Sequence, residues 1–174
     1  MDRSPQRFPV VLLVDPSLDD RAMQGDYLRA NGCSVVECAT GPDALARAST
    51  VDVVVTAIDL SGPFDGIELV RRLRAAENTH DKTIVVLTVC KTEPAQMRAA
   101  QAGCDVFLPK PCAPETLLAE IFRALALRVR VPRPTMAKAE DAARAQKADA
   151  LRPKSESLRE RSRDGRALGD KKPR

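Results

Sequence analysis

The stretch VVLLVD, residues 10–15, is a continuous run of apolar side chains that ends at Asp15. Its β-branched residues favour a strand, and the lack of polar alternation indicates that both faces of this strand are buried. Strands of this kind belong to parallel sheets, whose two faces are covered by helices. A helix is predicted to follow, because Met23, Tyr27 and Leu28 are spaced like one face of a helix.

The alternation of strand and helix continues to about residue 130. Strands are predicted at 10–14, 34–37, 52–56, 83–88 and 106–108, and helices begin near residues 19, 42, 66, 95 and 114. Right-handed crossovers join such units into an α/β fold with a five-stranded, doubly wound parallel sheet. The functional site of such a sheet lies at the carboxyl ends of its strands. The residues at these ends are Asp15, 57–59, Thr88 and Lys110.

The positive charge of the chain is concentrated after residue 130. Residues 1–130 contain 15 Lys and Arg against 17 Asp and Glu, whereas residues 131–174 contain 13 against 7. The segment Pro132-Arg133-Pro134 stops the last helix, and few large apolar residues follow it. We therefore expect one domain over residues 8–130 and a basic, disordered tail over residues 131–174. The sequence has no apolar run typical of a membrane helix or a signal peptide, so a cytoplasmic protein is expected.

The side chains at the predicted strand ends have a joint chemical use. A lysine, a threonine hydroxyl and several carboxylates at the mouth of a parallel sheet can hold a phosphoryl group with a divalent metal ion. The motifs around them are Val11–Asp15 with Arg21, Asp65–Leu69, Val85–Thr88 and Ala102–Pro111. In this order and spacing they resemble the receiver domain of two-component response regulators. The resemblance covers nearly all of residues 10–111, followed by the closing helix.

This resemblance implies a flavodoxin-like (βα)5 sandwich and roles for three residues. Lys110 would contact the phosphate, and its bond to Pro111 would be cis. Thr88 would be the switch hydroxyl, and Phe107 would be the aromatic side chain that changes rotamer with it. Both residues also suit ordinary packing in this fold, an interpretation that the sequence leaves open.

Two positions depart from the receiver pattern. Active receivers usually place a pair of acidic residues after the first strand, but here Asp15 is followed by Pro16. Counting from Asp52, or back from Asp65 with one inserted residue, places Ala57 where the phosphorylated aspartate belongs. A methyl group neither attacks a phosphoryl donor nor binds magnesium. The sequence therefore predicts a degenerate site without a metal ion or another cofactor.

Asp59 offers an alternative acceptor. It lies two residues after Ala57, so strand alternation would turn it to the same face if the strand continued. In that case the chain would be a functional phosphorelay receiver that uses Mg²⁺ bound by Asp15 and Asp59. In the other case Asp59 lies in the loop after the strand, at the position whose backbone carbonyl normally binds the metal ion in this family, which needs one inserted loop residue. Lys110 is then either a structural ion-pair partner in an acidic pocket of Asp15 and Asp59 or a residue that still binds an anion.

We interpret the chain as a stand-alone signalling and interaction module without catalytic residues of its own. The family resemblance implies that signalling proteins, or a second copy in a homodimer, dock on the face from Phe107 to Leu125. Nucleic-acid binding by the basic tail is a second alternative. It is disfavoured because acidic residues are interleaved through residues 131–174, which contain no aromatic residue to stack on bases.

Overall fold

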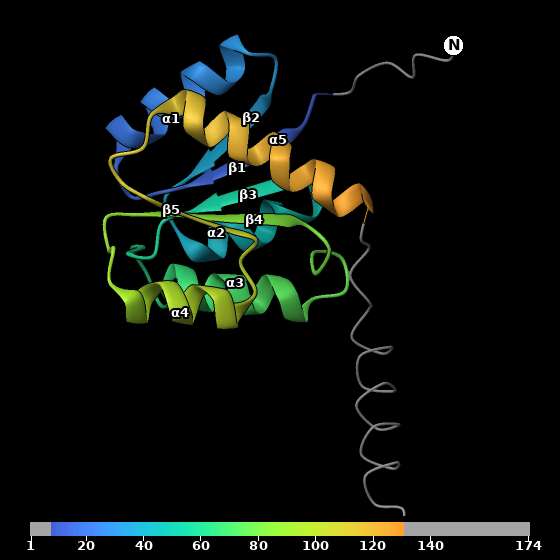
Figure 1. Ribbon diagram of the computed structural model, residues 1–174. Coiled ribbons are helices and arrows are strands. Elements are labelled where there is room, and N and C mark those ends of the chain that lie inside the picture. Colours follow the sequence, from blue (N-terminus) through green and yellow to red (C-terminus); the bar gives the residue numbers. More distant parts are fainter. Residues whose placement is uncertain (1–7, 131–174) are drawn as a thin grey trace, which may run out of the picture. The chain divides into compact units, whose positions relative to one another are not determined.

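A five-stranded parallel sheet forms the centre of the computed structural model, which describes residues 8–130 (Figure 1). The strands are β1 (Val10–Val14), β2 (Ser34–Cys38), β3 (Val53–Thr56), β4 (Thr83–Thr88) and β5 (Val106–Pro109). Their order is β2-β1-β3-β4-β5, and all neighbouring pairs are parallel. The predicted doubly wound α/β fold is confirmed.

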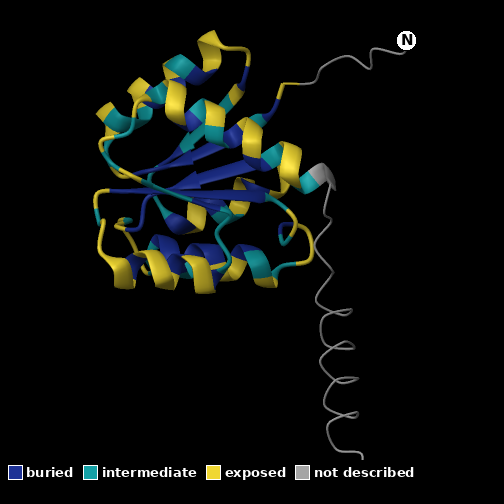
Figure 2. Ribbon diagram, in the orientation of Figure 1, coloured by how far each residue is buried: buried dark blue, intermediate teal, exposed yellow. Residues whose placement is uncertain are grey.

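Helices cover both faces of this sheet. They are α1 (Leu18–Ala30), α2 (Gly41–Arg47), α3 (Gly66–Ala75), α4 (Glu93–Ala102) and α5 (Pro114–Arg130), with a short 3₁₀ turn, η1 (Ala48–Thr50), after α2. Helices α1 and α5 lie on one face, and α2, α3 and α4 lie on the other (Figure 1). Two separate apolar layers result, with the central strands β1, β3 and β4 buried between them (Figure 2).

Side-chain caps set the starts of these helices. The side chains of Ser17, Thr40, Asp65 and Thr92 each accept a hydrogen bond from a backbone N–H in the first turn of the helix that follows. The cap at Thr92 starts α4 two residues before the predicted position, since Glu93 and Pro94 suit a first turn. At its other end α4 stops at Gly103, whose φ of 101° is in the left-handed region.

The inward face of α1 differs from the predicted one. Leu28 is buried as expected, but the side chain of Met23 is 50% exposed. The buried positions before Leu28 are Gln24 and Gly25. Gln24 is accommodated because its Nε2 donates a hydrogen bond to the backbone oxygen of Cys112 at 2.9 Å. Apolar periodicity could not indicate this face, because it contains a polar residue.

The predicted tail, residues 131–174, lies outside the described part of the chain. Within residues 8–130, no helix is both long enough and apolar enough to cross a membrane.

Candidate functional site

The carboxyl ends of the strands gather the predicted site residues at one edge of the sheet. Asp15 follows β1, Ala57 follows β3, Thr88 ends β4 and Lys110 follows β5. The strands are in register, with Val14 opposite Thr56 and Thr88 opposite Pro109. The peptide bond between Lys110 and Pro111 is cis, as the resemblance implied.

Lys110 is bonded to two carboxylates. Its Nζ donates to Oδ2 of Asp15 at 2.5 Å and to Oδ2 of Asp20 at 2.7 Å. The Lys110 side chain is only 13% exposed. Burial lowers the pKa of Lys110, but the hydrogen bonds to Asp15 and Asp20 and the negative charges of these two acids together raise it, so the net shift of the pKa is upward. The lysine is therefore held as a cation between the two acids.

The second acid differs from the predicted one. Lys110 was expected to pair with Asp15 and Asp59, but Asp59 is exposed in the loop after β3 and is not one of the two carboxylates bonded to Lys110. Strand alternation does not apply to Asp59 because β3 ends at Thr56. Asp20 takes its place, since Ser17 caps α1 and the first turn brings Asp20 to Lys110. An acidic residue in the first turn of a helix is common for reasons of the helix dipole alone, so the sequence did not indicate that Asp20 pairs with Lys110.

Ala57 is held at the end of β3, next to the end of β1. Its backbone N–H donates to the oxygen of Val14 at 2.9 Å, so it extends the pairing of β3 with β1 by one bond. Ala57 is 7% exposed. With Asp15, Asp20 and other residues it lines a small cavity at this edge. The side chain that the sheet presents here is a methyl group.

Thr88 and Phe107 lie at or near the carboxyl end of the sheet. Thr88 is buried, and its hydroxyl accepts a hydrogen bond from the backbone N–H of Cys90 at 3.2 Å. Phe107 is half-buried and packs against the apolar layer under α2, α3 and α4. These contacts are those of packing residues. The rotamer switch implied by the resemblance stays a prediction.

A magnesium ion would need several oxygen ligands at this edge. Asp15 and Asp20 carry carboxylates, but both are bonded to Lys110, and the side chain of Ala57 has no oxygen. In the described part of the chain, no three His, Cys, Asp or Glu side chains are grouped so that they could hold a metal ion. This arrangement of side chains does not fit a resident magnesium ion.

Comparison with known families shows which family this domain belongs to. The family model of the response regulator receiver domain matches residues 11–122. The chain therefore belongs to the response regulator receiver domain family, the receiving module of two-component signalling.

Individual proteins that the chain is similar to include response regulators. A cyclic di-GMP phosphodiesterase of Thermotoga maritima is 34% identical over 119 residues, which is 68% of this chain and 32% of that protein. The response regulator MprA of Mycobacterium leprae is 36% identical over 124 residues, which is 69% of this chain and 52% of MprA. The chain thus spans about a third and about half the length of these relatives. The structure of the chemotaxis response regulator CheY4 of Vibrio cholerae is 29% identical with a TM-score of 0.63, over 67% of this chain and 98% of that one.

Gly66, the first residue of α3, packs closely against the backbone of Ala57. A Cβ atom on Gly66 would lie 1.8 Å from the backbone oxygen of Ala57, which cannot move as a flexible side chain can. We expect Gly66→Ala to lower the free energy of unfolding by about 1–3 kcal/mol or more, as overpacking does. Urea unfolding measures this loss.

Gly25 in α1 provides a matched control. The atoms nearest to a Cβ on Gly25 are the ends of the long side chains of Glu37 and Arg29, which can shift. Gly25→Ala should therefore be tolerated, helped by the better helix propensity of alanine. A Gly66→Ala variant as stable as Gly25→Ala would contradict the close packing at Ala57.

Proposed function

We propose that this chain is an atypical receiver domain that signals through protein contacts and is not phosphorylated at the usual position. The observation that carries the proposal is Ala57, a methyl side chain directly after β3 that lines one small cavity with Asp15 and Asp20. Phosphoryl transfer to a receiver needs a carboxylate nucleophile, which alanine lacks. On this proposal the domain catalyses no phosphorylation of its own.

The ion pairs of Lys110 support a site that does not depend on a phosphoryl group. In a phosphorylated receiver a lysine at this position would counter the charge of the phosphoryl group. Here the ammonium group of Lys110 already has two carboxylate partners, at 2.5 and 2.7 Å. An anion would have to compete with both of them for the lysine, so we propose that the site rests in one state without a ligand.

Partner proteins are proposed to recognise the surface from Phe107 to Leu125. This part of the chain contains apolar side chains that are not fully buried, including Leu118 and Phe122, the latter 41% exposed. An apolar surface of this kind suits a protein contact.

Incubation with acetyl phosphate and Mg²⁺ tests the proposal. We expect the intact mass to stay unchanged, because Ala57 offers no nucleophile and Asp59 is exposed outside the bonded site. The Asp59→Asn variant should behave like the wild type. A gain of one phosphoryl mass that is lost in Asp59→Asn would overturn the proposal and establish Asp59 as the acceptor.

A further inference from the structure

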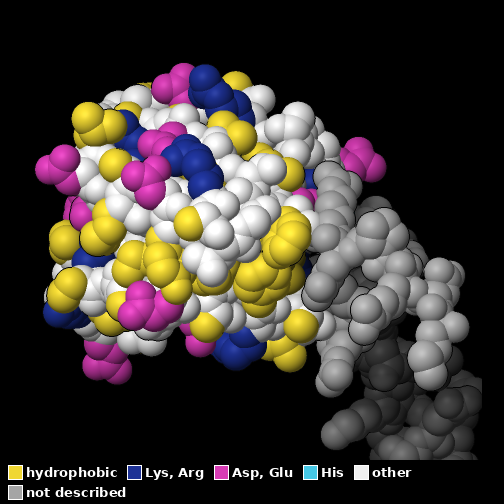
Figure 3. All heavy atoms as spheres, turned by 90° about the horizontal axis from the view of Figure 1, so that it is seen from above, with side chains coloured by type: hydrophobic (Ala, Val, Ile, Leu, Met, Phe, Trp, Pro, Cys, Tyr) yellow, Lys and Arg dark blue, Asp and Glu magenta, His cyan; other side chains and the backbone are white. Residues whose placement is uncertain are grey.

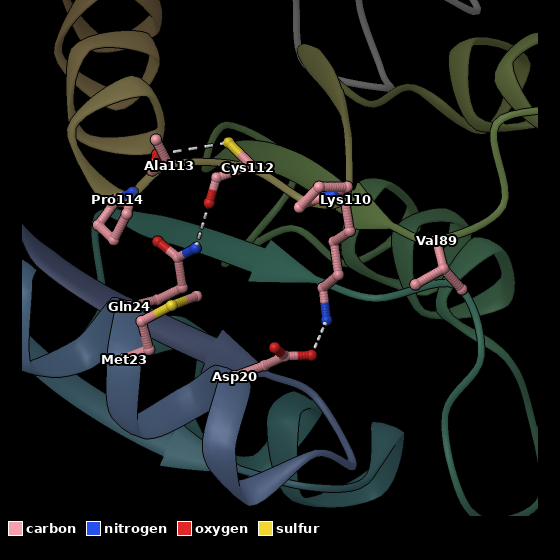
Figure 4. Close-up of a pocket in the computed structure, with 9 residues that line it drawn as sticks. Asp20, Met23, Gln24, Val89, Lys110, Cys112, Ala113 and Pro114 are labelled. Carbon is pink, nitrogen blue, oxygen red and sulfur yellow. Dashed lines mark hydrogen bonds and ion pairs between the residues drawn. The ribbon is translucent and has the colours of Figure 1, made fainter.

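Helix α1 is held differently at its two ends. In its first half, Asp20 pairs with Lys110 and Gln24 donates to the backbone oxygen of Cys112, so this half is fastened to the segment after β5 (Figure 4). Its other end is the exposed turn Asn31-Gly32, which leads into β2. This turn contains the only asparagine in the sequence that is followed by glycine.

An asparagine followed by glycine is open to a self-modification, because glycine leaves its own backbone nitrogen unshielded. After losing its proton, the nitrogen of Gly32 would attack Cγ of Asn31. The new C–N bond closes a cyclic imide, the bond from Cγ to Nδ2 breaks, and ammonia leaves with the proton. Water then opens the imide and leaves aspartate or isoaspartate at position 31. The turn itself therefore supplies the nucleophile and the group that is attacked, and water is the one further reactant.

The fold holds Asn31 in a geometry that does not react. Ring closure requires the nitrogen of Gly32 on the same side of the Cα–C bond as the Asn31 side chain. The ψ angle of Asn31 is 21°, which turns this nitrogen away from the side chain. The N–H of Gly32 donates to the oxygen of Arg29 at 3.0 Å, and Nδ2 of Asn31 donates to the oxygen of Tyr27 at 2.8 Å. Both reacting groups are thus bonded within the last turn of α1.

The ring of Phe8 covers this turn. A Cβ atom on Gly32 would lie 2.8 Å from Cε1 of Phe8, so the ring lies directly against the glycine. The next residue, Cys33, is buried, and its N–H donates to the oxygen of Leu28 at 3.0 Å. The rotation that ring closure requires would break the bond of Gly32 and disturb these contacts, so it requires the end of α1 to open.

We propose that Asn31 is a site of slow self-modification, in which deamidation waits for the last turn of α1 to open. Helix ends open locally at a lower free energy than the core, so the rate follows the population of the open turn. This inference goes beyond the proposed function and does not depend on which residue occupies the acceptor position.

Incubation of the full-length chain in mildly alkaline buffer, with and without guanidinium chloride, tests the site. Peptide mass spectrometry follows the exchange of the amide for a carboxyl group at each asparagine. We expect Asn31 to convert in the denaturant and to convert at least about tenfold more slowly in the folded chain. Equal rates in both conditions, or no conversion in the denaturant, would overturn the proposal.

Asn78 is an internal control in the same sample. It is exposed like Asn31, but Thr79 follows it, and the β-branched side chain of this threonine shields the nitrogen that would attack. In the denaturant, Asn78 should convert at least about tenfold more slowly than Asn31. Equal conversion of the two asparagines would show that the glycine does not select the site.

Phe8→Ala tests whether the cover controls the rate. Without the ring the turn should open more often, so Asn31 in the folded variant should convert roughly two- to fivefold faster than in the wild type. Phe122→Ala is the matched control, because Phe122 is similarly exposed at 41%, against 51% for Phe8, but lies on α5. Circular dichroism establishes that each variant is folded. Equal rates in the two variants would overturn the control by Phe8.

The product should loosen the same end of α1. Acidic and basic side chains already lie exposed on the face covered by α1 and α5 (Figure 3). A carboxylate at position 31 opposes the helix dipole and has no N–H for the oxygen of Tyr27, so Asn31→Asp should speed amide exchange at residues 31–33 roughly two- to fivefold. Hydrogen exchange with mass spectrometry measures this change. Exchange as slow as in the wild type would contradict a structural effect of the modification.

Discussion

Replacing Asp105 by alanine is expected to lower the free energy of unfolding by about 3–5 kcal/mol. One carboxylate oxygen of Asp105 accepts hydrogen bonds from Ile84 N at 2.8 Å, Arg74 Nη2 at 2.8 Å and Arg128 Nη2 at 2.9 Å. Both guanidinium groups are largely buried, with side-chain exposures of 13% and 17%. Alanine would leave two neighbouring cations without their shared anion and Ile84 without an acceptor.

Two controls separate charge from hydrogen bonding at this site. Asp105→Asn keeps an oxygen that can accept from Ile84, so its loss of stability in urea unfolding should be smaller than that of Asp105→Ala. Asp81→Ala removes an exposed aspartate and should change stability by no more than about 0.5 kcal/mol. Equal losses for Asp105→Ala and Asp81→Ala would contradict the role of Asp105.

Introducing two carboxylates at the sheet edge should have the largest effect on phosphorylation. We expect the double variant Ala57→Asp with Pro16→Asp to accept a phosphoryl group from acetyl phosphate with Mg²⁺. Ala57→Asp alone should be slower by at least about tenfold, because it still lacks one of the carboxylates around the metal ion. The two substitutions should act non-additively, since their side chains share one ion. Intact mass against time measures both rates.

A further variant shows where the phosphoryl group is attached. Adding Asp59→Asn to the double variant should leave its rate unchanged, because Asp59 is exposed in the loop beyond β3. A double variant no faster than Ala57→Asp would contradict the need for a second carboxylate at position 16.

The strands were the most predictable part of the fold. Strand β4 matches its predicted range, residues 83–88, because the continuous run TIVVLT of apolar and β-branched residues favours a buried strand. The edge at which Asp15, Thr88 and Lys110 gather also followed from the sequence, because parallel connections bring the carboxyl ends of the strands together.

The pairing within this edge was less predictable. Asp20 and Lys110 are 90 residues apart, and no local pattern links a charge in the first turn of a helix to a lysine after the last strand. Gln24 was missed for a related reason, because a polar residue on the buried face of α1 breaks the apolar periodicity from which such faces are recognised. The contacts of Asp20 and of Gln24 both depend on how α1 packs beside the segment after β5.

The separation between Asp15 and Lys110 also has a consequence for the order of events during synthesis. These residues are 95 positions apart, so the ion pair closes a loop that includes most of the domain. Until residue 110 has emerged from the ribosome, a nascent chain carries Asp15 and Asp20 without their cation, and two like charges lie close together in sequence. The lysine that neutralises the edge is thus added late in synthesis, after all five strands have been made.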